Sequence, residues 1–345
     1  MTARAFITGL EKTVVTADEQ AFLRDADPWG FILFARNIDD PDQVRRLIAD
    51  LRGTLGRNAP VLIDQEGGRV QRLRPPHWPS YPPGAAYGQL YDHDREAGLA
   101  AARMGARLIA ADLAALGIDV DCLPLADVPV AGADAVIGDR AYGETPAKVS
   151  ALAAAVAEGL RRGGVLPVLK HIPGHGRATA DSHADLPVVD ADRAMLECTD
   201  FAAFRPLAGL PLAMTAHVVF TAIDPVAPAT TSATMVRQVI RGEIGFGGLL
   251  MSDDISMGAL SGSIGERSRA AIAAGCDVVL HCNGRLDEMK AVAAEAPGLA
   301  DQAAQRATAA LAARSAPDDI DLAATRAEFA TLMGGMAAGS ARISA

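Results

Sequence analysis

The sequence contains few of the features that mark membrane, secreted or nucleic-acid-binding proteins. No stretch of its 345 residues approaches the roughly 18 to 20 uninterrupted apolar residues of a membrane span. The N-terminal residues lack an apolar run behind a basic end, so a secretory signal is not expected. The formal net charge of -10 comes without a basic stripe, which argues against a nucleic-acid partner. We therefore expect a cytoplasmic protein with neither a membrane nor a nucleic-acid partner.

Cysteine is also scarce, and no two cysteines form a CxxC pair. This usage favours buried free thiols in a reducing compartment over disulfides or a zinc site. The four residues are Cys122, Cys198, Cys276 and Cys282. Half of the chain is hydrophobic and no segment is a polar low-complexity tract, so the sequence can form a large core.

Eight apolar runs of strand length alternate with helical stretches. The runs are 3–10, 30–35, 60–65, 117–126, 164–171, 210–219, 247–254 and 276–283. Several carry Val, Ile and Leu at consecutive positions, which is typical of strands buried on both faces. Eight strand-helix units predict a single-domain (β/α)8 barrel over residues 1–315, followed by a C-terminal helix and flexible tail over 316–345.

A doubly wound open sheet is the alternative architecture for an alternating α/β sequence. It would need a glycine-rich phosphate-binding turn after an early strand. Neither GxGxxG nor GxxxxGK[ST] occurs in the sequence, so the barrel is favoured.

Polar residues cluster where five of the expected strands end. They are Asp64-Gln65-Glu66, Lys170-His171, His217, Asp253-Asp254 and His281-Cys282-Asn283. In (β/α)8 barrels the C-terminal strand ends and the loops after them build the active site. The pattern therefore predicts an active site at that face of the barrel.

Residues 170–183, KHIPGHGRATADSH, contain three of the chain's seven histidines. One interpretation is a metal centre formed by His171, His175 and His183. Against it, no HxH pair lies on a strand, no HExxH lies on a helix, and Lys170 would bring a positive charge toward the cation. We therefore expect no metal in this loop.

Proton transfer is the better interpretation of the same loop. Asp181 stands two residues before His183, close enough to hydrogen-bond the imidazole, fix its tautomer and raise its basicity. A plain surface histidine is the alternative. The segment from Lys170 to a helix expected near Asp192 is about 20 irregular residues, a length typical of functional loops. His175, within PGHG, is assigned a hinge or packing role.

A nucleophile is expected at the end of the run 247–254. Asp253 is a carboxylate at a barrel strand end, opposite a proton donor on a loop, as a retaining glycosidase requires. The alternative is that the Asp-Asp pair caps a helix, and Asp254 is the expected cap.

Other charged residues near strand ends fit the recognition of sugar hydroxyls, because carboxylate and guanidinium groups bind vicinal oxygens in pairs. Surface salt bridges are the alternative for the first three of them. The candidates are Asp64, Arg72, Arg140, Lys170 and His171.

Five segments together resemble a known family. They are DQEGGRVQRL (64–73), VIGDRAYG (136–143), KHIPGHG followed by DSH (170–183), MTAHVVF (214–220) and SDDISM (252–257). The sequence is similar to the bacterial β-N-acetylhexosaminidases of glycoside hydrolase family 3, and most similar to its single-domain members, from about residue 25 to 285. Ile172 stands where the family usually has Phe, and Ile255 where it usually has Leu.

The resemblance implies a role for each candidate. Asp253 matches the catalytic nucleophile, His183 the acid/base histidine, and Asp181 the partner of that histidine. Five positions match residues that hold the N-acetylglucosamine unit: Asp64, Arg72, Arg140, Lys170 and His171.

The resemblance also implies a small-molecule carbohydrate substrate. Family members of this size remove N-acetylglucosamine from 1,6-anhydro-N-acetylmuramic acid-containing muropeptides during peptidoglycan recycling in the cytoplasm. Such an enzyme needs no cofactor, no metal and no obligate protein partner.

Three other functions stay open at this point. A glycoside phosphorylase could use the same scaffold, because a histidine acid/base does not repel phosphate as a carboxylate would. A metal-dependent hydrolase and a non-catalytic sugar sensor are the other two, and the intact Asp253, His183 and Asp181 argue against the sensor.

Overall fold

The structure of the protein is a computed structural model that describes residues 2–182 and 185–340. Eight parallel strands close into a barrel in the order β1-β12-β11-β9-β7-β6-β3-β2. They are β1 (Arg4–Thr8), β2 (Pro28–Leu33), β3 (Val61–Ile63), β6 (Val120–Asp121), β7 (Leu166–Ile172), β9 (Leu212–Thr215), β11 (Leu249–Asp254) and β12 (Val278–His281). Each overlaps one of the eight expected runs, so the predicted (β/α)8 fold is confirmed.

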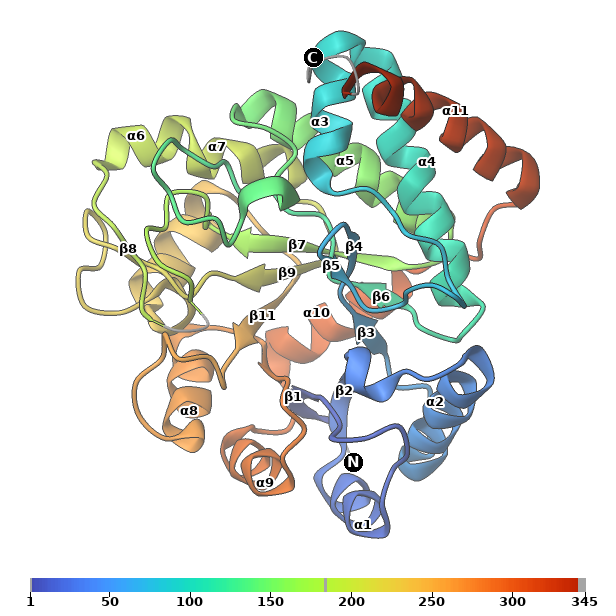
Figure 1. The fold of residues 1–345 in the computed structure, drawn as a ribbon. Coiled ribbons are helices and arrows are strands. Elements are labelled where there is room, and N and C mark those ends of the chain that lie inside the picture. Colours follow the sequence, from blue (N-terminus) through green and yellow to red (C-terminus); the bar gives the residue numbers. More distant parts are fainter. Residues whose placement is uncertain (1, 183–184, 341–345) are drawn as a thin grey trace.

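Most of the helices lie around the barrel, and one of them, α10 (Asp301–Ala312), is seen at its centre (Figure 1). They are α1 (Ala17–Ala26), α2 (Pro41–Leu55), α3 (Gly84–His93), α4 (Arg95–Ala114), α5 (Pro146–Arg162), α6 (Arg193–Cys198), α7 (Asp200–Phe204), a π-helix (Met235–Glu243), α8 (Ile264–Ala274), α9 (Leu286–Glu295), α10 (Asp301–Ala312) and α11 (Leu322–Ser340). Local sequence sets several of their ends. Thr16 and Ser263 form capping boxes with Glu19 and Glu266, which satisfy backbone N–H groups at the starts of α1 and α8.

Successive side chains of a barrel strand point to opposite faces of the sheet, so the core consists of two layers. Side chains such as Ile7, Leu62 and Val168 belong to one buried cluster that includes residues of all eight barrel strands and of α10, and this cluster fills the barrel. Neighbouring residues such as Phe6 and Ile63 belong to a second cluster, shared with the surrounding helices. The barrel is therefore a packed core rather than a channel.

Two small sheets lie beside the barrel. The hairpin of β4 (Gln65–Gly67) and β5 (Val70–Gln71) continues from β3. Gly67 has a φ of 98°, and a Cβ there would lie 2.3 Å from the carbonyl oxygen of Pro82, so only glycine fits this turn. The second sheet pairs β8 (Val188–Val189) with β10 (Val219–Phe220). The expectation that residues up to Asp192 lack regular structure is therefore wrong at β8.

Two further expectations need correction. Cys198 is exposed, whereas the other three free cysteines are buried, because it lies at the end of the short surface helix α6. Asp254 does not cap a helix, because it ends β11 and the next helix, α8, is capped by Ser263.

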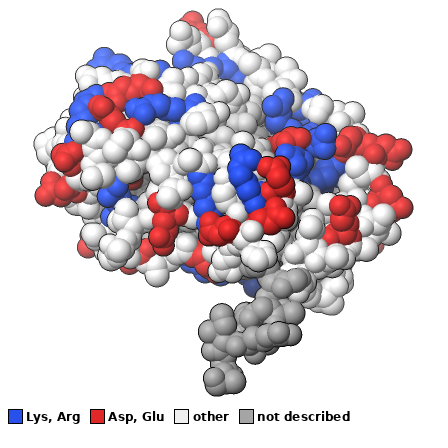
Figure 2. All heavy atoms as spheres, turned by 90° about the horizontal axis from the view of Figure 1, so that it is seen from above, with Lys and Arg blue, Asp and Glu red and all other residues white. Residues whose placement is uncertain are grey.

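The outer surface carries charges of both signs. On the face shown in Figure 2, Lys and Arg side chains lie among Asp and Glu side chains. This face therefore offers neither an extended basic nor an extended acidic surface. No helix within residues 2–182 and 185–340 combines the length and apolar character needed to cross a bilayer.

Candidate active site

A cavity of about 260 Å³ opens where the barrel strands end. It contains every predicted site residue that the structure describes: Asp64, Arg72, Arg140, Lys170, His171, Asp181 and Asp253. The remaining one, His183, lies outside the described residues. Residues far apart in sequence thus meet in one place because β3, β7 and β11 all run toward the same end of the barrel.

A buried network of charges forms one wall of the cavity. Lys170, only 2% exposed, lies with its Nζ 3.0 Å from Asp64 Oδ1 and 2.6 Å from Glu66 Oε1. Arg72 donates to Asp64 Oδ2 over 3.0 Å. Arg140 donates to both oxygens of Glu66, over 2.9 and 2.8 Å. Two carboxylates are therefore held by three cations.

This pairing decides the charge state of the network. Burial acts to raise the pKa of Asp64, but Lys170 and then Arg72 outweigh it and hold that pKa below its usual range. The same competition, with Lys170 and Arg140 as the cations, lowers the pKa of Glu66. Both carboxylates are ionised at neutral pH and can accept hydrogen bonds from sugar hydroxyls.

Arg72 can also donate to a ligand. Its side chain is 26% exposed and lines the cavity, and among the described residues its guanidinium hydrogen-bonds only Asp64, through Nη2. The buried Nε has no acceptor among those residues, but it is not accessible to a ligand, so the outer N–H groups are the ones that can meet a ligand oxygen.

Asp253, at the end of β11, faces the same cavity. Its Oδ1 accepts the backbone N–H of Asp254 over 2.8 Å, and this bond orients the carboxylate. Burial acts to raise the pKa of Asp253, but the neighbouring His217 and His171 outweigh it and lower that pKa. Asp253 is therefore a fixed, ionised carboxylate, which suits a nucleophile.

His217 supports the strand end that carries Asp253. It is fully buried, with Nδ1 2.7 Å from Thr230 Oγ1 and Nε2 2.9 Å from the backbone oxygen of Asp254. A carbonyl oxygen only accepts, so Nε2 carries the proton. Burial is the main reason that the pKa of His217 is lowered, and the ring is neutral at pH 7.

Asp254 ties two strand ends together. Its carboxylate accepts the hydroxyl and the backbone N–H of Ser256, over 2.6 and 3.0 Å, and the backbone N–H of Cys282 over 3.1 Å. Cys282 follows β12, so this side chain fastens the end of β11 to the end of β12. It acts as a structural neighbour of Asp253 rather than as a helix cap.

His171 is held by a buried carboxylate that sequence reasoning missed. Asp127, fully buried, accepts His171 Nδ1–H on Oδ2 over 2.8 Å. Its Oδ1 accepts the backbone N–H groups of His171 and His175, over 3.3 and 2.7 Å. In the neutral imidazole the proton is thus on Nδ1, which leaves Nε2 as an acceptor.

Glu66 was expected in the polar cluster at the end of the third strand, but it was not singled out as a binding residue. The signal that could have found it is its position two residues after Asp64, since a strand places such residues on one face. Asp127 has a similar signal, because it follows directly on the fourth expected strand, 117–126. Neither signal identifies a partner, and the partners lie 74 and 44 positions away, at Arg140 and His171.

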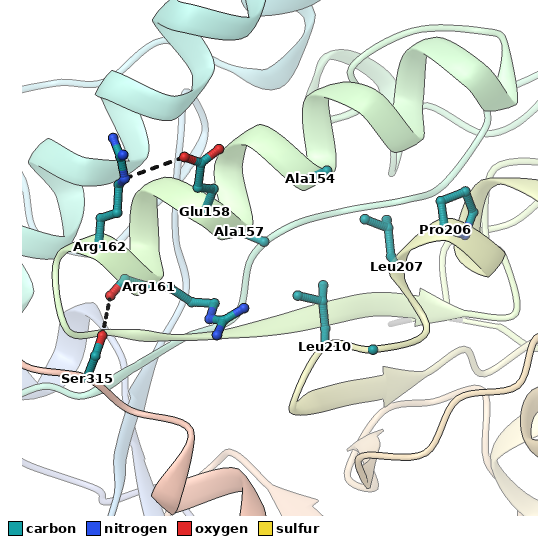
Figure 3. A pocket seen from close by; sticks show the side chains of 10 residues that line it. Ala154, Ala157, Glu158, Arg161, Arg162, Pro206, Leu207, Leu210 and Ser315 are labelled. Carbon is teal, nitrogen blue, oxygen red and sulfur yellow. Dashed lines mark hydrogen bonds and ion pairs between the residues drawn. The ribbon is translucent and has the colours of Figure 1, made fainter.

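A second cavity, of about 460 Å³, lies between α5 and the segment that precedes β9 (Figure 3). Ala154 and Ala157 line it from the helix, and Leu207 and Leu210 from the opposite segment. It contains none of the predicted site residues that the structure describes. The chemistry suited to a sugar is therefore in the cavity at the strand ends.

Within the described residues, no group of three or more His, Cys, Asp or Glu side chains is arranged to hold a metal ion. Asp64 and Glu66 are instead paired with Lys170 and with Arg72 and Arg140. The described part of the cavity is thus built from ion pairs and imidazoles.

Comparison with known proteins places the chain in a family. Residues 7–310 match the Glycosyl hydrolase family 3 N terminal domain. Among curated proteins, the Beta-hexosaminidase of Alkalilimnicola ehrlichii is 42% identical over 281 residues, covering 80% of this chain and 79% of that one. The Beta-hexosaminidase of Aromatoleum aromaticum is 39% identical over 273 residues, covering 78% and 76%. The chain belongs to glycoside hydrolase family 3 and is a glycoside hydrolase of the β-hexosaminidase type.

Comparison with solved structures shows which members of the family have a similar fold over most of this chain. NagZ from Neisseria gonorrhoeae superposes with a TM-score of 0.84 at 32% identity, and the match covers 97% of each chain. The same protein in complex with N-trifluoroacetyl-D-glucosamine gives a TM-score of 0.84 at 31% identity over 98% of each chain. The chain is thus similar to NagZ over nearly its whole length, and the expected family resemblance is confirmed.

Proposed function

We propose that the protein is a retaining β-N-acetylglucosaminidase. It cleaves terminal N-acetylglucosamine from 1,6-anhydro-N-acetylmuramic acid-containing muropeptides, in the cytoplasmic recycling of peptidoglycan. The observation that carries the proposal is that ionised Asp253 shares one cavity with the Asp64–Lys170–Arg72 network. A sugar ring held by that network can thus present its anomeric carbon to Asp253.

Asp253 is the proposed nucleophile. In the first step its carboxylate oxygen forms a bond to the anomeric carbon while the bond from that carbon to the leaving oxygen breaks. In the second step water attacks the same carbon and releases Asp253. Two inversions restore the original β configuration, so the product has retained stereochemistry.

His183, held by Asp181, is the proposed acid/base. Asp181 lines the cavity. The imidazole gives its proton to the departing oxygen in the first step and takes one from water in the second. Its ordinary pKa of about 6.5 suits both steps near neutral pH, whereas a carboxyl acid would need a raised pKa.

The charged wall of the cavity is proposed to hold the N-acetylglucosamine unit. Asp64 can accept hydrogen bonds from hydroxyls, and the exposed N–H groups of the Arg72 guanidinium can donate to one. Lys170 and Arg140 keep the carboxylates fixed, and His171 offers Nε2 as an acceptor. This donor and acceptor set fits a neutral, hydroxyl-rich ring.

Hydrolysis of p-nitrophenyl N-acetylglucosaminide and of a muropeptide disaccharide tests the proposal. We expect the free sugar as product of both, in its β form when it is first released, and the same product with and without added phosphate. A sugar phosphate formed in phosphate buffer would instead show a phosphorylase, an alternative that no observation here favours. An absence of turnover with both substrates would contradict the proposed activity.

A further inference from the structure

His175 and Ser182 form a buried contact that the proposed catalytic roles do not use. Each side chain belongs to a residue that is only 3% exposed, and both line the active-site cavity. His175 Nε2 lies 3.2 Å from Ser182 Oγ. In the sequence, Ser182 stands between Asp181 and His183, the two residues proposed as the acid/base pair.

His175 has a fixed position from which to hold Ser182. Its backbone N–H donates to Asp127 Oδ1 over 2.7 Å. Its ring packs edge-on against His171, with ring centroids 5.7 Å apart. The next residue, Gly176, lies against the backbone of Val128 so closely that a Cβ would come within 2.1 Å of that carbonyl oxygen. The start of the loop is therefore part of the rigid barrel rim.

The surroundings of the His175 ring indicate which of the two side chains donates the hydrogen bond between His175 and Ser182. His175 Nδ1 is buried and has no partner among the described residues. An unpaired buried N–H is rarer and more costly than an unpaired acceptor, so the proton of the neutral ring is on Nε2 and is donated to Ser182 Oγ. Burial and then His171 lower the pKa of His175 to about 4, which keeps the ring neutral at pH 7.

A second hydrogen bond, made by its backbone, also holds Ser182 in place. Its backbone oxygen accepts the N–H of Ala259 over 3.1 Å. Ala259 belongs to the segment that follows Asp253 and β11, whereas His175 follows β7. The two bonds therefore join the centre of the Asp181-Ser182-His183 sequence to both of the strand ends that flank the cavity.

We propose that His175 and Ser182 are positioning residues for the proposed acid/base pair, because they fix the chain at Ser182, beside Asp181. The inference rests on the proposed function, because it gives Asp181 and His183 the acid/base role. It replaces the hinge or packing role expected for His175 from the sequence. Neither residue needs to touch the substrate for this purpose.

Substrates with different leaving groups distinguish a residue that positions the acid from one that only supports the structure. A well-placed acid speeds the departure of a basic alkoxide but hardly affects an activated phenol, which leaves without protonation. kcat/KM reports the first irreversible step, and that step includes leaving-group departure. Loss of positioning should therefore reduce kcat/KM for the disaccharide much more than for a dinitrophenyl glycoside.

The test compares Ser182→Ala and His175→Ala with the conservative variants Ser182→Thr and His175→Gln, which keep the hydroxyl and an N–H donor. We expect each alanine variant to lose about tenfold in kcat/KM on the muropeptide disaccharide and less than about threefold on the dinitrophenyl glycoside. The conservative variants should recover most of the loss. Ser315→Ala is the matched control and should behave as wild type, because Ser315 is not among the residues that line this cavity and its hydroxyl donates to the Arg161 carbonyl.

Two outcomes would overturn the proposal. One is an equal loss on both substrates in the alanine variants, which would mean general damage to the site. The other is no loss on the disaccharide. Thermal unfolding of each variant shows whether it is folded, and the conservative variants keep the comparison valid if an alanine variant is not. Inactivity of the wild type on both substrates would instead refute the proposed function, so the two failures are distinguishable.

Discussion

The ammonium group of Lys170 lies 3.0 Å from the carboxylate of Asp64, although the two residues are 106 positions apart. The contact exists because β3 and β7 end at the same face of the barrel. It is buried, and Glu66 binds the same ammonium group at 2.6 Å. A cation in this position offsets the repulsion between two neighbouring carboxylates.

Replacing Lys170 with Met should therefore both destabilise the protein and weaken sugar binding. The change removes the cation that Asp64 and Glu66 share and leaves them with Arg72 and Arg140 alone, and breaking a buried ion pair costs up to about 3–5 kcal/mol in the free energy of unfolding. KM for N-acetylglucosaminides should rise, because Asp64 and Glu66 lose their fixed positions. Urea unfolding and steady-state kinetics measure the two effects.

The control for this prediction is Lys148→Met. Lys148 pairs with Asp92, whose side chain is 65% exposed, so the change should cost no more than about 1 kcal/mol. Equal stability losses in the two variants would show that Lys170 has no special role in holding the carboxylates.

The proposed acid/base pair makes a prediction about leaving groups. His183→Ala should reduce kcat/KM about 10²-fold or more for glycosides with poor leaving groups and much less for activated phenyl glycosides, because only the former need a proton. Asp181→Asn should give the same pattern more weakly, through a wrongly set tautomer. If both kinds of substrate lose rate equally in His183→Ala, then that histidine binds substrate and the acid lies elsewhere.

His175 should make stability depend on pH. Its pKa is lowered to about 4 in the folded protein, against about 6.5 for an unperturbed imidazole. Between these values the unfolded chain binds the extra proton, so the free energy of unfolding should fall as pH drops from about 6.5 to about 4. The loss from this residue is about 3 kcal/mol at most.

His175→Gln removes that proton-binding site and should flatten the pH dependence of the free energy of unfolding. His217, whose pKa is also lowered by burial, remains in the variant and leaves a residual slope. Equilibrium unfolding of both proteins at several pH values gives the difference. Parallel curves for wild type and variant would mean that His175 does not titrate as this account requires.

The sequence is a good guide to this fold because the barrel strands are apolar runs, and five of the eight end in polar residues. Val61–Ile63 followed by Asp64, and Leu249–Met251 followed by Ser252 and Asp253, show the pattern. The strands are buried on both faces, so composition alone separates them from loops. The short strand β8 has only two residues, too few for any pattern.

The sequence does not show which charged side chains pair with one another. Arg140 was expected at the site, but its partner Glu66 emerges only when the chain folds, and the same holds for His171 and Asp127. Asp254 was misjudged for a related reason. A carboxylate before a polar turn looks like a helix cap, and only the fold shows that it accepts from the backbone of Cys282.

Trapping of the reaction intermediate tests the central claim most directly. A fluorinated N-acetylglucosaminide with an activated leaving group should form the glycosyl-enzyme faster than water removes it. Mass spectrometry of the intact protein, followed by peptide mapping, should show one sugar per chain, bound to Asp253, and Asp253→Asn should stay unlabelled. Turnover without any labelled protein would point to attack by the substrate's own acetamido group, and a label on another residue would place the nucleophile elsewhere. Either result would contradict the assignment of Asp253.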